Sequence, residues 1–334
     1  MSKLLRGLAL TATLIGSAAT VQAETVLKLA SVAPSTSPWG KWVAGVAQQI
    51  EEKSGGDLKL QLLLDAQAGD EQTILRQTIR GRIDIAYVSN TPLTILSQEI
   101  ALASAPYLFS SAEEGTCVAH EHMGEVFGTL MQDAGVVPLT WMEVGQYVIF
   151  SKDPVKVPTD LNGKKTRVAA TVTDEAYARA LGTSGVPMGT SDTIPALQTG
   201  TVDAAFFPTV FGIAIGTHKV APHVVQTNHS RLIGTAAVSE RSWAKLSPEH
   251  QALLKETFGA AGPQLTAMIL GAEQALLGKL ETAGVPVYRP TQDELAQWQA
   301  AAANVLEETA NDIGGKSQEV VAALNAAKAV CAQN

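Results

Sequence analysis

From residue 25 onward, the hydrophobic and polar positions follow first the pattern of a strand, then that of a helix, and then that of a strand again. Residues 25–30 (TVLKLA) alternate as in a half-buried strand. Ser37-Pro38 then supplies a helix cap and a first helical position, apolar residues recur at helical spacing, and Gly55-Gly56 ends the helix. Residues 58–64 (LKLQLLL) are strand-like again. This order predicts a βα unit of the kind that builds parallel sheets.

One sequence unit occurs twice. Residues 74–86 and residues 194–205 both pass from a helical pattern through Gly, a variable residue, a branched aliphatic residue and Asp into a strand. The two aspartates, Asp84 and Asp203, stand where a carboxylate can accept hydrogen bonds from nearby backbone amides, so we expect them to be structural. The repetition, in a chain of 334 residues, predicts two related α/β lobes.

A long helical pattern dominates the last third. Ser247-Pro248-Glu249 is a strong helix start, and apolar residues recur at helical spacing to about Leu280. Gly259, Gly262 and Pro263 are the positions where this helix would kink or split. Beyond it, residues 285–288 predict a strand, and residues 291–329 predict two polar-faced helices separated near Gly314-Gly315.

The N-terminus has the pattern of an export signal. Basic residues Lys3 and Arg6 precede a short stretch of apolar and small residues, and Val21-Gln22-Ala23 fits a small-x-small cleavage pattern. We therefore expect a signal peptide over residues 1–23 and a periplasmic product. No apolar run is long enough to span a bilayer. The net charge of −8 argues against nucleic acid or an anionic membrane as a partner.

The chain has two cysteines, Cys117 and Cys331. In an oxidising compartment they either pair and close a long loop or remain free thiols, and the sequence leaves both states open. Cys117, His120 and His122 have a spacing seen in metal sites, but no second ligand pair follows at zinc-site spacing. Solvated helix residues are the favoured interpretation, and we predict no metal and no cofactor.

Catalytic motifs give little support to an enzyme. The sequence contains no credible nucleophile elbow, S-x-x-K or H-E-x-x-H motif and no phosphate-binding loop, although the residues of a catalytic triad need not be close in sequence. We therefore do not expect an enzyme.

Four groups of short motifs follow one another in a characteristic order. They are residues 53–56 with 67–71 and 81–84, residues 160–168, residues 186–188 with 196–203, and residues 227–230 with 243–248. Together they resemble the extracytoplasmic solute-binding proteins of tripartite ATP-independent periplasmic (TRAP) transporters, of the DctP type. The resemblance covers nearly all of the chain after the signal peptide.

This resemblance implies a fold. It implies an α/β, two-lobe clamp like that of periplasmic binding proteins, with mixed sheets flanked by helices and one long helix spanning both lobes. Crossings between lobes near residues 145 and 230 would place residues 24–145 and about 231–265 in the first lobe. Residues 146–230 and about 266–334 would form the second. The protein would be a monomer that traps a small organic anion and delivers it to the membrane permease subunits.

The resemblance also assigns ligand-binding residues. Arg167 stands where the family has an arginine that grips the ligand carboxylate, and a guanidinium matches a carboxylate with two parallel hydrogen bonds. This chain departs from the family at three other places, where Phe207 replaces an Asn, Tyr147 replaces a second Arg, and Thr190 replaces an aromatic residue. With fewer polar partners for carboxylates, we expect a monoanion with an apolar or neutral body, and weak binding of dicarboxylates or sialic acid.

Further candidates are weaker. Gln146, Glu71, Tyr87, Ser89 and His229 match or adjoin positions that face the cleft in relatives, and His229 is either a donor or a hinge residue. Trp39 follows the first strand, at the end where α/β proteins bind ligands, or packs as the apolar start of its helix. Phe206 and Phe207 should point to opposite faces of their strand, so that one is in the core.

Two other functions share this fold. A periplasmic ligand sensor that serves a signalling receptor would have the same lobes, and so would the binding protein of an ATP-driven (ABC) importer. The sequence alone does not separate these functions from transport by a TRAP system.

Overall fold

The backbone of the molecule is a ten-stranded mixed sheet, seen here in a computed structural model that describes residues 24–332. Its main path runs β2-β1-β3-β9-β4-β7-β5-β6, with β8 beside β4 and β10 beside β8. The predicted signal peptide lies outside the described residues. The strands are β1 (Thr25–Ala30), β2 (Leu58–Leu63), β3 (Ile85–Ser89), β4 (Val136–Ser151), β5 (Lys165–Val168), β6 (Ser184–Pro187), β7 (Ala204–Pro208), β8 (His223–Val225), β9 (Arg231–Ser239) and β10 (Val287–Tyr288).

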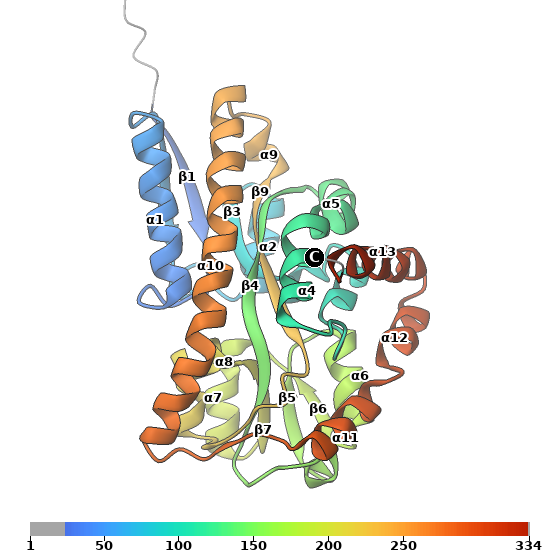
Figure 1. The fold of residues 1–334 in the computed structure, drawn as a ribbon. Coiled ribbons are helices and arrows are strands. Elements are labelled where there is room, and N and C mark those ends of the chain that lie inside the picture. Colours follow the sequence, from blue (N-terminus) through green and yellow to red (C-terminus); the bar gives the residue numbers. More distant parts are fainter. Residues whose placement is uncertain (1–23, 333–334) are drawn as a thin grey trace, which may run out of the picture.

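Helices cover the sheet and connect its strands (Figure 1). Within the described residues, no helix is both long enough and apolar enough to cross a membrane. The helices are α1 (Pro38–Lys53), α2 (Glu71–Ile79), α3 (Asn90–Leu93), α4 (Ala112–Cys117), α5 (Met123–Asp133), α6 (Val172–Ala180), α7 (Thr190–Thr199), α8 (Thr209–Ala214), α9 (Glu240–Trp243), α10 (Pro248–Thr282), α11 (Gln292–Ala302), α12 (Val305–Ile313) and α13 (Ser317–Cys331), with 3-10 turns at Gln98–Ser104, Pro158–Leu161 and Thr217–Lys219 and a π-helical turn at Val118–His122.

The predicted βα unit at the start of the chain is confirmed. β1 and β2 pair in parallel from Thr25 opposite Leu58 to Ala30 opposite Leu63. α1 joins them, and its Ser37 cap accepts a hydrogen bond from the amide of Gly40 at 3.2 Å.

The repeated aspartates have the structural role that we expected. Asp84 accepts a hydrogen bond from the amide of Lys28 at 2.8 Å, and Asp203 accepts one from the amide of Lys165 at 3.0 Å. In each case the carboxylate, just before its own strand, binds the backbone of the neighbouring parallel strand. The repetition therefore records equivalent strand junctions in the two lobes.

Strand β4 carries the chain from one lobe to the other. It pairs with β9 from Val136 to Gln146 and with β7 from Tyr147 to Ser151. The partner changes between Gln146 and Tyr147, close to the crossing expected at 145. The return crossing lies between β8 and β9. We call residues 143–147 and 226–231 the hinge. The first lobe holds β1–β3, β9 and the first part of β4, and the second holds β5–β8, β10 and the rest of β4.

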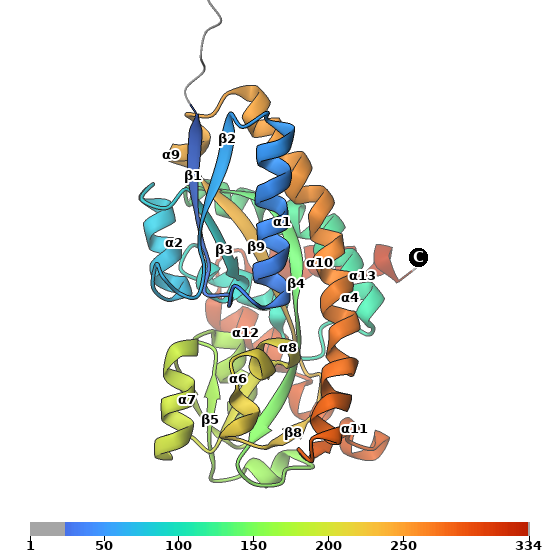
Figure 2. The same ribbon diagram turned by 90° about the vertical axis from the view of Figure 1, so that its left-hand side faces the viewer.

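The long helix predicted from Ser247 is confirmed as α10, a continuous helix of 35 residues. It lies alongside both lobes, as Figures 1 and 2 show. Its residues Phe258 and Leu265 pack in a first-lobe core, whereas Leu277 and Leu280 pack in a second-lobe core. Pro263 lies inside the helix without ending it. Gly262 has a packing role, because a side chain there would collide with Thr140 of β4.

The C-terminal segment differs from the prediction in two respects. Residues 291–329 form parts of three helices rather than two, because the chain also turns between α11 and α12. The assignment of residues 266–334 to the second lobe was wrong for the end of the chain. Trp298 of α11 is buried in a second-lobe core, but Ala310 of α12 and Leu324 of α13 belong to a first-lobe core. The segment therefore crosses from the second lobe to the first.

Candidate functional site

A cavity of about 610 Å³ lies between the two lobes. Many of its lining residues are at or just beyond the carboxyl ends of strands, which is where α/β proteins bind ligands. Such residues are Val32 after β1, Ser89 at the end of β3, Arg167 with Ala169 and Ala170 at the end of β5, Pro187 and Met188 at the end of β6, and Phe207 and Pro208 at the end of β7.

Arg167 is the most unusual residue of this cavity. Its side chain is only 4% exposed. The guanidinium donates to the carbonyl oxygen of Phe206 at 2.8 Å and to that of Met188 at 3.2 Å. It lies over the ring of Phe207, 4.0 Å from the ring centroid, in a cation–π contact. Its Nε atom is buried without a hydrogen-bond partner.

No carboxylate within the described chain lies close enough to form an ion pair with Arg167. Burial lowers the pKa of Arg167, and the nearby acids Asp174 and Glu71 partly offset this effect at longer range. An arginine nevertheless remains charged in a protein. A buried cation without a partner is costly, so this arrangement is complementary to an anion that enters the cavity.

The facing wall of the cavity carries a carboxyl group. Glu71, at the start of α2 in the first lobe, accepts hydrogen bonds from the amide of Ser89 at 2.6 Å and from its hydroxyl at 2.8 Å. Burial raises the pKa of Glu71, while the bonds from Ser89 and the charge of Arg167 act in the opposite direction. Glu71 and Ser89 therefore form a fixed polar pair on the lobe opposite Arg167.

The rest of the wall is largely apolar. Tyr147 and Phe207 line it from β4 and β7, and Thr190, the first residue of α7, lies at its edge. Phe206 and Phe207 do point to opposite sides of β7, because Phe206 is in one second-lobe core and Phe207 in the other. The structure thus brings together six of the residues singled out from the sequence, namely Arg167, Phe207, Tyr147, Glu71, Ser89 and Thr190.

Gln146 and His229 lie elsewhere, in the wall of a smaller cavity of about 330 Å³ at the hinge. Nδ1 of His229 is 2.7 Å from the hydroxyl of Thr227. The imidazole packs among aromatic rings, with centroids 4.8 Å from Phe206 and 5.6 Å from Tyr147. Burial lowers the pKa of His229 to about 3, so it is neutral. The sequence left His229 as either a hydrogen-bond donor to the ligand or a hinge residue, and this position favours the hinge residue.

Tyr87 and Trp39 are not in the cavity wall, which corrects their selection as cleft residues. Tyr87 is two residues before the end of β3, so its ring is buried inside the first lobe, 5.3 Å from that of Trp42. Trp39 also packs in this core, where it forms the apolar start of α1, and its ring centroid lies 5.7 Å from that of Phe211.

Sequence reasoning missed several apolar lining residues. Phe211 lies in α8, the short helix that follows β7, Ile215 comes directly after that helix, and Met188 follows β6. Their signal was available, because each comes shortly after a strand whose carboxyl end faces the cavity. Single apolar residues at such positions are, however, more often part of the core.

Comparisons with known proteins place this geometry in context. The uncharacterized protein YiiZ of Salmonella typhimurium is 32% identical over 242 residues, which cover 71% of this chain and 73% of YiiZ. Two solved structures have similar folds. The periplasmic solute-binding protein of Sulfurospirillum deleyianum with bound succinate has a TM-score of 0.84 at 22% identity, and covers 91% of this chain and 99% of its own. The sugar acid binding protein DctPAm of Advenella mimigardefordensis, in complex with galactonate, has a TM-score of 0.86 at 20% identity, with the same coverage.

The family comparison is the most extensive. The model of the bacterial extracellular solute-binding proteins of family 7, DctP, matches residues 29–312. This match covers most of both lobes, the cavity between them, α11 and all but the last residue of α12, but it does not include α13. The chain therefore belongs to the DctP family, and it is a solute-binding protein rather than an enzyme.

Proposed function

We propose that this protein is the periplasmic solute-binding subunit of a TRAP transporter and that it captures a small organic monoanion with an apolar or neutral body. The observation that carries the proposal is the buried guanidinium of Arg167, which faces the cavity between the lobes without a carboxylate partner. Succinate and galactonate, the ligands in the two structural relatives, both carry carboxylate groups that such an arginine can bind.

The charges around the cavity favour one carboxylate over two. Arg167 is the single basic residue in the described lining, whereas Asp70, Glu71 and Asp192 are acidic. A second carboxylate on the ligand would find no cation and would approach these acids, which costs free energy. Phe207, Phe211 and the other apolar side chains suit an uncharged ligand body instead.

Binding would work through clamp closure. Arg167 belongs to the second lobe, whereas Glu71 and Ser89 belong to the first, so a ligand in contact with both walls joins the lobes. A ligand shifts an open–closed equilibrium only by its difference in affinity for the two states. In this proposal the closed, loaded protein, exported by its signal peptide and acting as a monomer, is the form that the membrane permease recognises.

A thermal-shift screen tests the proposal. The mature protein would be screened with monocarboxylates, dicarboxylates, sulfonates and neutral solutes. A ligand at 100 times its dissociation constant adds about 2.7 kcal/mol of apparent stability. We expect a monocarboxylate to give this shift. Arg167→Ala should lose it, whereas Lys165→Ala, which removes an exposed positive charge from the same strand, should keep it. Tight binding of a dicarboxylate with none of the monocarboxylates would contradict the monoanion proposal.

A further inference from the structure

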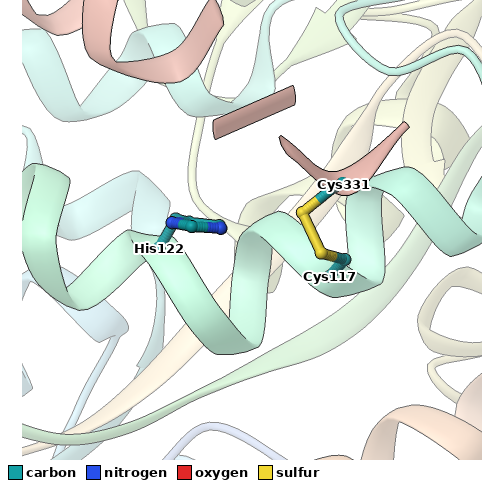
Figure 3. Close-up of side chains that lie close together, drawn as sticks. All are labelled: Cys117, His122 and Cys331. Atoms are coloured by element: carbon teal, nitrogen blue, oxygen red, sulfur yellow. A yellow bond between two sulfur atoms is a disulfide. The ribbon is translucent and has the colours of Figure 1, made fainter. Parts of the chain in front are cut away.

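A second group of side chains with possible chemistry lies outside the lining of the ligand cavity, where α13 meets α4. Cys117 and Cys331 form a disulfide across 214 residues of sequence, with their Cα atoms 5.7 Å apart. His122 lies beside it, and the potential ligand atoms of the three residues are all within 4.8 Å of one another (Figure 3). The disulfide attaches α13, and with it the C-terminal segment, to the first lobe.

The composition of this group differs from the one that the sequence suggested. His120 turns away, and its Nε2 lies 2.9 Å from the hydroxyl of Thr266 on α10. The third member comes instead from the C-terminus, as Cys331. Cys331 is so distant in sequence from the other two residues that no short motif could include it.

The backbone explains why His122 faces Cys117. In an α-helix, residues five apart point in directions that differ by about 140°. Residues Val118–His122 form a π-helical turn, and the amide of Met123 accordingly donates to the carbonyl of Val118, five residues earlier. Such a turn places residues five apart on nearly the same side of the helix. Single π turns inside α-helices are often found at functional sites.

The imidazole of His122 has the environment of a metal ligand. Its Nδ1 lies 3.6 Å from the carboxylate of Glu125, which is 82% exposed. Its Nε2 is buried and has no hydrogen-bond partner. Figure 3 shows the ring beside the disulfide with one nitrogen on the sulfur side. Metal-binding histidines commonly hold one ring nitrogen against a carboxylate and leave the other for the ion.

We propose that reduction of the Cys117–Cys331 disulfide creates a site for a thiophilic divalent cation of the zinc class, bound by the two sulfur atoms and His122. A dithiol reductant transfers two electrons and two protons to the disulfide, so that two thiols form while the reductant becomes a disulfide itself. Binding of the cation then releases both thiol protons, because thiolates are the ligands. The cation keeps one position for water.

The donor set determines the class of ion. Two thiolates and an imidazole favour Zn²⁺ and its spectroscopic substitute Co²⁺ over Mg²⁺ or Ca²⁺, which prefer oxygen ligands. The metal site would also take over the structural role of the reduced disulfide. The disulfide joins α13 to the first lobe in the oxidised chain, and the metal joins the same two residues in the reduced chain.

Titration of the mature protein with Co²⁺ tests the proposal. After reduction with a phosphine, we expect one Co²⁺ per chain, with a thiolate-to-cobalt charge-transfer band and the visible bands of tetrahedral coordination. Zn²⁺ should displace the Co²⁺ and abolish these bands, whereas the oxidised protein should bind none. His122→Ala should weaken Zn²⁺ binding by at least about tenfold. Loss of a residue that only supports a metal ligand already costs at least about tenfold in metal affinity, and in this proposal His122 is itself a ligand.

The neighbouring histidine provides a matched control. His120→Ala removes an imidazole from the same turn but not from the group, so it should leave Zn²⁺ affinity within about twofold of the native value. If the reduced protein binds no Co²⁺, or if His120→Ala and His122→Ala weaken binding equally, the proposal is wrong. If reduction unfolds the chain, Zn²⁺ should restore its circular dichroism spectrum and raise its melting temperature. Failure to do so would also overturn the proposal.

Discussion

Arg167 in the cleft and Arg231 at the hinge are both buried arginines, but their surroundings differ. Arg231 is 6% exposed and forms an ion pair with Glu143, to which its Nε also donates at 3.1 Å. It donates further to the hydroxyl of Thr116 at 3.2 Å. Arg167 is 4% exposed and has two carbonyl oxygens and an aromatic ring in place of a carboxylate.

The two arginines differ in whether a carboxylate of the protein pairs with them. At the hinge a second carboxyl, Glu273 of α10, lies near Glu143, so two acids share one arginine. In the cleft one arginine faces open space. The difference distinguishes an arginine with a structural role from one that is available to bind a ligand. The charges at the hinge are satisfied within the protein, whereas the charge in the cleft is left for a ligand to satisfy.

The largest effect should come from Arg231→Met. This change leaves Glu143 buried without its partner, which typically costs about 3–5 kcal/mol. We expect a loss of that size in the free energy of unfolding, measured by urea denaturation of the ligand-free protein. The double variant Arg231→Met with Glu143→Gln removes both charges and should recover much of it. If the double variant is as unstable as the single one, the ion pair is not the cause.

Arg167→Met should have the opposite consequence for stability. It removes a buried charge that no carboxylate neutralises, so the ligand-free protein should stay within about 1 kcal/mol of the native stability or become more stable. The same denaturation experiment measures this. Its contrast with Arg231→Met is the informative result, because the side chains are equally buried. A loss of several kcal/mol in the ligand-free state would mean that Arg167 is structural.

Local sequence predicted some of this and not the rest. The βα unit, α10 and the structural role of Asp84 and Asp203 follow from patterns of adjacent residues. Arg167 was identified because the chain resembles a family in which that position binds ligand. Arg231 was not identified, since its partner Glu143 is 88 positions away and neither residue belongs to a motif.

The errors have the same origin. Tyr87 and Ser89 have the same parity on β3, yet only Ser89 is at the end of the strand and reaches the cavity. α13 belongs to the first lobe because its Leu324 packs in a first-lobe core and because a disulfide across 214 residues holds it there. Contacts between distant segments decided each case, and a single sequence does not specify them.

The last expected effect concerns pH and the second acid of the hinge. Glu273 accepts a hydrogen bond from the amide of Gln146 at 2.7 Å, and burial raises the pKa of Glu273 to about 7. The folded protein therefore holds a proton that the unfolded chain releases near its ordinary value of 4.5. Between these values the unfolded state binds fewer protons, so this group makes the free energy of unfolding fall as the pH rises, with no further change above the folded pKa.

Glu273→Gln should remove this contribution, because the amide stays neutral and its oxygen still accepts from Gln146. We expect a flatter dependence of stability on pH between about 4.5 and 7, measured by urea denaturation across that range. Glu256→Gln, on an exposed part of the same helix, is the control and should leave the slope unchanged. Equal slopes for Glu273→Gln and the native protein would mean that Glu273 is ionised in the fold. The hinge would then hold two ionised acids around Arg231, in sharper contrast to Arg167, which has no carboxylate in an ion pair.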